Sequence, residues 1–190
     1  MNTKFIEHIR NSSEAMAKRW AKMVSQSTFT TTYQKLSKEE LTRLGKNVYD
    51  NLGRWLDPKT QQEEIGRIYA KIGSERYEQG FPLCELHYAV HFTKKVLLAH
   101  IFAEGLLPDT LKLYQTYDFI QDIYDFFDLA VFYETRGFQE ALYKKIMAQK
   151  GIDKEKAKEI FPHGSFYFEV EPDFRTFEKA LDGFNVFKVK

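Results

Sequence analysis

Two histidines stand four residues apart in a stretch whose apolar pattern is helical. His87 and His91 would lie on one face of a helix, where both imidazoles could bind the same metal ion. A haem site needs only one proximal histidine and an apolar pocket, so either residue could serve there. The same spacing is also typical of a half-exposed helix edge. A metal- or haem-binding gas or redox sensor is therefore kept as the alternative function.

A carboxylate interrupts an apolar row further along the chain. Glu134 comes three residues after Val131 and four before Phe138, where the helical pattern predicts a hydrophobic residue. A buried carboxylate needs a partner to offset its desolvation. We select Glu134 and its neighbour Arg136 as candidate ligand-binding residues.

The common local signatures of catalysis are missing from the sequence. It has no Gly-rich phosphate loop, nucleophile elbow, His-Glu-x-x-His or Cys-x-x-Cys, and no Glu-x-x-His of the di-iron bundles. We therefore expect a protein that binds rather than catalyses, with no catalytic residues and no required cofactor. An enzyme assembled from Glu134, Arg136, tyrosines and a histidine is the third hypothesis.

Helices are the elements expected to position these residues. Apolar residues recur at three- and four-residue intervals over most of the chain. Punctuation by Gly and Pro divides this pattern into helices over about 3–26, 38–56, 60–79, 83–104 and 109–149. We predict an all-α helical bundle of about five main helices, for which a globin-like arrangement is one option. Residues 1–150 would form a sensor-like domain, and 151–190 an irregular C-terminal tail packed on it, with an extended segment at 165–170 and a small helix at 173–181.

Local signals fix several helix ends. Ser37 and Glu40 form a capping box at the start of the second helix. Gly80 can take the left-handed conformation that ends the third helix, followed by Phe81 and by Pro82, which cannot continue it. Within that helix Gly66, Ala70 and Gly73 make a smooth strip, which favours close approach by a neighbouring helix over approach by a ligand.

Composition limits the classes of partner. Aromatic residues make up 16% of the 190 residues, which predicts a ring-rich core, and the formal net charge of +1 provides no field for nucleic acid or acidic lipid. Cys84 is the only cysteine, so an internal disulfide is impossible. The N-terminus lacks a secretory signal and no apolar run reaches the length of a membrane span. We expect a soluble cytoplasmic protein with no nucleic acid or membrane partner.

The segment from Tyr69 to Leu86 resembles a known family. Its pattern Gly-x-x-Arg-x-x-x-Gly-x-Pro-Leu-x-Glu-Leu includes Arg76, Pro82 and Glu85. It is similar to the RsbRD N-terminal domain family, the sensory module of RsbT co-antagonist proteins of the bacterial stressosome, and the likeness covers roughly residues 10–148. The resemblance implies a helical, dimeric sensor without catalytic residues, in which Arg76 and Glu85 bind a ligand or hold the architecture.

The leading hypothesis is a stand-alone sensory or regulatory module of the stressosome-sensor type. It would bind a small ligand or a protein partner in a signalling pathway. No STAS-type output domain is visible after the helical part, which motivates the stand-alone reading. The long helix at 109–149 carries two apolar rows, more than one neighbour can cover, and is the predicted interface of a homodimer.

Overall fold

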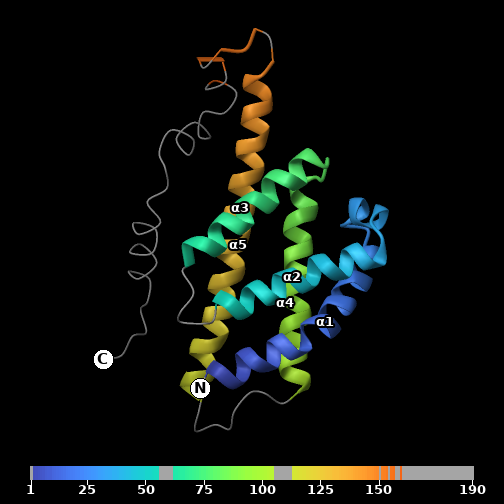
Figure 1. Ribbon diagram of the computed structural model, residues 1–190, viewed down its shortest axis with the longest axis vertical. Helices are drawn as coiled ribbons and strands as arrows, with labels where there is room; N and C mark the ends of the chain where they lie inside the picture. The colour runs from blue at the N-terminus through green and yellow to red at the C-terminus, as the bar shows by residue number, and fades with distance from the viewer. Residues whose placement is uncertain are drawn as a thin grey trace, which may run out of the picture. The chain divides into compact units, whose positions relative to one another are not determined.

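The computed structural model describes residues 2–55, 62–104, 113–149, 151–153, 155, 156 and 159 (Figure 1). The chain divides into two compact units, Met1–Phe138 and Gln139–Lys190. The candidate site lies within the first unit. The extended segment predicted at 165–170 and the helix predicted at 173–181 fall outside the described residues, and the packing of the tail on the helical domain stays a prediction.

The regular structure of the described residues comprises five α-helices, one short 3-10 helix and the helical residues 155, 156 and 159. The α-helices and the 3-10 helix are α1 (Asn2–Gln26), η1 (Thr31–Lys35), α2 (Lys38–Trp55), α3 (Gln62–Glu78), α4 (Leu83–Ala103) and α5 (Leu113–Met147). The all-α fold class is confirmed, while the globin-like arrangement stays a prediction. Among the described helices, none combines the length and the apolarity that a membrane span requires.

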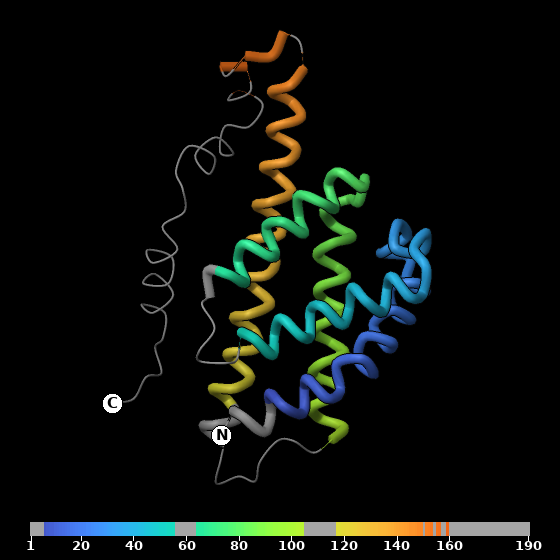
Figure 2. Tube along the Cα trace, in the orientation of Figure 1, coloured from blue at the N-terminus to red at the C-terminus, as the bar shows by residue number. Residues whose placement is uncertain are grey.

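The two N-terminal helices pack side by side through the apolar face predicted for α1 (Figure 2). Ile9, Met16, Trp20 and Val24 are all buried. Gly45 allows the backbone of α2 to lie close to Trp20. A Cβ built on Gly45 would lie 2.8 Å from the indole ring. The indole N–H of Trp20 donates to the carbonyl of Ala89 at 2.8 Å and so joins α1 to α4 as well.

The capping box at the start of α2 is confirmed. The backbone N–H of Ser37 donates to the Glu40 carboxylate at 3.0 Å, and the N–H of Glu40 donates to the Ser37 hydroxyl at 3.1 Å. Two amides that a helix start leaves without partners are thereby satisfied.

The junction between α3 and α4 also forms as predicted. Gly80 has φ +77°, its N–H donates to the Tyr77 carbonyl, and the N–H of Phe81 donates to the Arg76 carbonyl, both at 3.0 Å. This pair of bonds is the Schellman motif, which needs a residue that tolerates the left-handed conformation. Pro82 then precedes α4 in an extended conformation. Gly80 and Pro82 therefore determine where α3 ends and α4 begins.

The smooth strip on α3 is confirmed as a helix-packing surface. A Cβ on Gly73 would lie 1.9 Å from the backbone oxygen of Glu134, and one on Gly137 would lie 1.7 Å from the backbone oxygen of Ala70. A Cβ on Gly66 would meet the Tyr133 ring at 2.9 Å. Helices α3 and α5 therefore cross with their backbones in contact, and this crossing fixes where Glu134 lies relative to α3 (Figure 1).

The segment between α1 and α2 contains structure that the sequence did not indicate. The sequence predicts no helix between the first one, which ends at about residue 26, and the second, which begins at 38, but η1 lies in this segment. Thr30 is buried and its hydroxyl donates to the Val24 carbonyl at 2.7 Å, and Tyr33 is buried against Trp20 and Phe81. Tertiary burial of Thr30 and Tyr33 thus gives order to a stretch whose local composition favours a loop.

The two apolar rows predicted on α5 have different surroundings. One row is buried throughout and comprises Phe119, Ile123, Phe126, Ala130 and Tyr133. The other row is buried at Phe127, whereas its Tyr117 and Tyr124 are 51% and 39% exposed. The first row and Phe127 therefore belong to the core. The homodimer interface expected on this helix stays a prediction.

Candidate functional site

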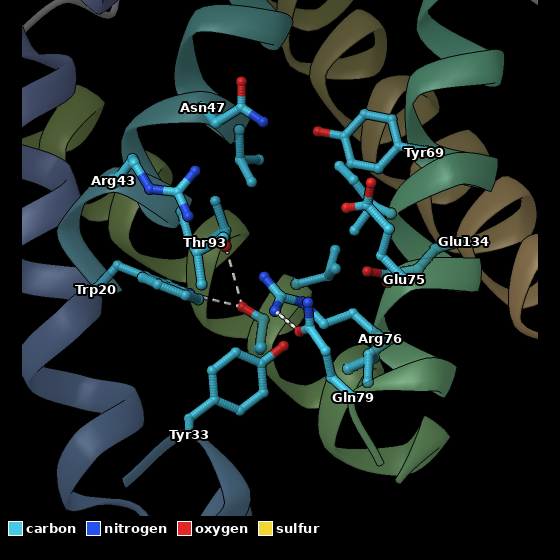
Figure 3. Close-up of a pocket in the computed structure, with 16 residues that line it drawn as sticks. Trp20, Tyr33, Arg43, Asn47, Tyr69, Glu75, Arg76, Gln79, Thr93 and Glu134 are labelled. Atoms are coloured by element: carbon cyan, nitrogen blue, oxygen red, sulfur yellow. Dashed lines mark hydrogen bonds between the residues drawn. The ribbon is translucent and has the colours of Figure 1, made fainter. Parts of the chain in front are cut away.

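A cavity of about 170 Å³ lies among the helices of the first unit (Figure 3). Every element from α1 to α5 contributes to its wall. The apolar part of the wall comprises Trp20, Leu44, Val48, Ile72, Leu86, Ala89 and Val90. Polar side chains complete the lining, so the cavity combines a hydrophobic body with a few hydrogen-bonding groups, as small-molecule sites do.

The mouth of the pocket lies between α2 and α3. Its exposed lining residues are Arg43 and Asn47 on α2, Glu75 on α3, and Gln79 just after α3. Both signs of charge are present there. These exposed polar side chains lie between the solvent and the buried wall.

Glu134 forms the most unusual part of the buried wall. It is 5% exposed, and its Oε2 has no hydrogen-bond partner among the residues that the structure describes. Burial raises the pKa of Glu134 to about 7, and the positive charge of Arg76 opposes this shift. The side chain can therefore donate a hydrogen bond in its protonated form or accept one in its ionised form close to neutral pH.

Tyr69 offers a second unpartnered group in the same wall. It is 2% exposed, its hydroxyl makes no hydrogen bond of good geometry with the described residues, and in Figure 3 that hydroxyl points toward the cavity. Burial, followed by the charge of Glu134, raises the pKa of Tyr69, and the nearby Asn51 side chain lowers it. An unsatisfied buried polar group costs about 1–3 kcal/mol. Two such groups in one pocket wall indicate a site that is completed by something other than the described side chains.

Arg76 joins the pocket to the α3–α4 junction. Its guanidinium donates to the Gln79 side chain and lies 4.9 Å from the centre of the Phe81 ring, while the residue also lines the cavity. The structure thus brings Arg76 and Glu134, two residues selected separately from the sequence, to one pocket. Sequence spacing could not connect them, because the contact depends on the crossing of α3 and α5.

Glu85 has a structural environment away from this cavity. Its buried carboxylate accepts hydrogen bonds from the Thr31 hydroxyl at 3.0 Å, the Thr32 N–H at 2.8 Å and the Thr32 hydroxyl at 3.2 Å. These bonds anchor the start of η1 to the first turn of α4. The contacts account for Glu85 as an architectural residue.

Replacing Glu85 with alanine should lower the free energy of unfolding by about 2–3 kcal/mol, because the Thr32 amide and two hydroxyls lose a charged acceptor. Urea unfolding measures the change. The exposed Glu78→Ala serves as the matched control and should stay within about 0.5 kcal/mol of the wild type. Equal effects of the two substitutions would contradict the anchoring role.

The predicted metal ligands have different surroundings in the structure. The His87 Nε2 lies 2.7 Å from the Thr135 hydroxyl, and burial lowers the pKa of His87. His91 is exposed and its ring lies beside Tyr88. Within the part of the chain that the structure describes, no three His, Cys, Asp or Glu side chains are grouped to hold a metal. Binding of a metal or haem by His87 and His91 stays a prediction.

Arg136 lies half-buried on α5 and is not part of the cavity wall. Its selection as a ligand-binding residue also stays a prediction. The sequence did not single out Thr93, which lines the cavity from α4 and donates to the Ala89 carbonyl at 3.0 Å. Thr93 stands three residues after Val90 and four before Leu97, the same break in an apolar row that marked Glu134. This break in the apolar row would have identified Thr93 as a candidate site residue from the sequence.

Comparison with known proteins identifies the family. Residues 2–140 match the family model described as "Histidine kinase N terminal". No curated protein and no solved structure matches the chain. The match supports a sensor domain of the histidine kinase type, which agrees with the sensory role implied by the sequence resemblance, but it does not extend to the RsbRD or stressosome type in particular. The chain, with its helical fold and the pocket around Glu134, belongs to the histidine kinase N-terminal family.

Proposed function

We propose that this domain is a non-catalytic sensory module that binds a small molecule in the pocket around Glu134. The observation that carries the proposal is the pair of unpartnered groups, Glu134 Oε2 and the Tyr69 hydroxyl, in the wall of one cavity. A ligand that hydrogen-bonds to both would remove two desolvation costs at once. The family match supports a sensory role for such binding.

The lining defines the kind of ligand. Leu44, Val48 and Ile72 offer an apolar wall, while Glu134 and Tyr69 offer hydrogen bonds at the buried end. The volume of about 170 Å³ suits a small organic molecule, since a cavity of about 150 Å³ can hold benzene. We infer a ligand with an apolar body and at least one hydrogen-bonding group.

Binding could be read out by the arrangement of the helices. The cavity wall draws on α2, α3, α4 and the part of α5 that belongs to the first unit. A ligand that contacts several helices favours the arrangement in which those contacts form, and shifts the population toward it. The domain would thus sense the ligand because binding stabilises one arrangement of the helices relative to the others.

A small-molecule fraction extracted from the source cells tests this proposal. At a concentration of 100 times its Kd, a ligand should stabilise the protein by about 2.7 kcal/mol, or roughly 5–10 °C in Tm. Val48→Phe should fill the cavity and abolish that rise, because Val48 lines it. Val131→Phe is the matched control, since Val131 is also half-buried but does not line the cavity. An equal rise in Tm for both variants would show that the ligand binds outside this cavity.

A further inference from the structure

A pair of histidines that the sequence did not connect joins α1 to α4 on a part of the unit separate from the pocket. The Nε2 atoms of His8 and His100 lie 3.1 Å apart, and both side chains are half-buried. The two ring planes are inclined at only 19°, with ring centres 5.2 Å apart. The distance between the ring centres exceeds the distance between the two Nε2 atoms by almost the diameter of an imidazole ring. The rings therefore meet edge to edge, and their Nε2 atoms face each other.

This geometry fits a shared proton and does not fit a shared metal ion. A metal bound by two imidazoles lies about 2.0–2.1 Å from each nitrogen and needs both lone pairs to converge on it at an angle. Two nitrogens that face each other at 3.1 Å leave no room between them for such an ion. They are instead at the distance of an N–H···N hydrogen bond, in which one ring donates and the other accepts.

We propose that His8 and His100 form a proton-operated latch that holds the N-terminal part of α1 to the C-terminal part of α4. The latch is closed when one Nε2 carries a hydrogen and the other does not, since one ring must donate the hydrogen bond and the other must accept it. When both rings are protonated, two N–H groups and two positive charges face each other and the latch opens. This inference does not depend on ligand binding in the pocket.

The surroundings of the pair agree with opening at acidic pH. Burial lowers the pKa of His100, and the charge of His8 lowers it further; Arg19 acts in the same direction and Glu104 in the opposite one. The unfolded state therefore binds more protons than the folded state below the ordinary histidine pKa of about 6.5. The stabilisation from the latch is fully present above that pH and is lost as the pH falls.

Amide hydrogen exchange at pH 7.5 and pH 5.5 tests the latch in the full chain. Protection factors, corrected for intrinsic exchange, should be lower at pH 5.5 than at pH 7.5 around residues 6–10 and 98–101. The decrease should be about tenfold for each unit by which the pKa of His100 is lowered in the folded protein. His100→Gln and His8→Gln should each remove this pH dependence, because glutamine does not titrate. His91→Gln, exposed on the same helix, should behave as the wild type. Unchanged pH dependence in both latch variants would overturn the proposal.

Nitrogen NMR of the wild-type imidazoles gives a second readout that needs no substitution. At pH 7.5 one Nε2 of the pair should carry a hydrogen and the other should not. Two protonated Nε2 atoms at that pH would overturn the latch.

Discussion

Replacing Gly73 with alanine should destabilise the domain by about 3 kcal/mol or more, at or beyond the upper end of the usual cost of overpacking. The new Cβ would lie 1.9 Å from the backbone oxygen of Glu134 and 2.9 Å from the backbone nitrogen of Phe138. Neither atom can move without shifting α5. Urea unfolding measures the loss, and complete failure to fold is the extreme of the same result.

Gly53→Ala is the matched control for this prediction. The nearest described atoms to a Cβ there belong to the Arg10 side chain, at 3.2 Å and beyond, and this side chain can move aside. Alanine is favoured over glycine inside a helix by about 0.5–1 kcal/mol, so the control should be neutral or slightly stabilising. Tolerance of Gly73→Ala at the level of Gly53→Ala would contradict the close crossing of α3 and α5, and with it the placement of Glu134.

Replacing Glu134 with glutamine should stabilise the domain at pH 8 by up to about 3 kcal/mol and change little at pH 4.5. Burial raises the pKa of the wild-type carboxyl in the folded protein to about 7, from an ordinary value of 4.5. The unfolded state therefore loses its proton first, and stability falls as the pH rises from about 4.5 to about 7. Glutamine cannot ionise, so the difference in unfolding free energy between the two proteins should grow over that window.

Glu85→Gln is the matched control for the Glu134 prediction, because Glu85 is also a buried carboxyl but accepts three hydrogen bonds. Its replacement should destabilise the domain at pH 8 rather than stabilise it. A Glu134→Gln effect that is the same at pH 4.5 and pH 8 would show that the carboxyl does not titrate over this range.

The parts of the fold that the sequence predicts are those that depend on local chemistry. The capping box of Ser37 and Glu40 and the turn at Gly80 use contacts within a few residues, so their residue types suffice. The Gly66 to Gly73 strip predicts a close neighbour because glycine inside a helix otherwise has a cost. It does not say which helix is that neighbour, since nothing local distinguishes α5 from the others.

The candidate site is predictable only in fragments for the same reason. Glu134 stands out because it interrupts an apolar row, and Thr93 carries the same signal. The sequence pattern at Tyr69 is that of an ordinary core aromatic residue. Its unpartnered hydroxyl can be recognised only when the positions of α3 and α5 are known. The pocket also depends on η1, which supplies Tyr33 and whose order comes from tertiary burial rather than from its polar sequence.

Carbon NMR of the Glu134 side-chain carboxyl tests ligand binding in the pocket most directly. Glutamate-labelled protein, assigned with Glu134→Gln, would be titrated with the small-molecule fraction of the source cells, and the buried Glu85 would serve as the internal reference. We predict that the Glu134 resonance and its apparent pKa change on addition of the fraction while the Glu85 resonance stays in place. A fraction that raises the Tm of the protein but leaves the Glu134 resonance unmoved would contradict the site.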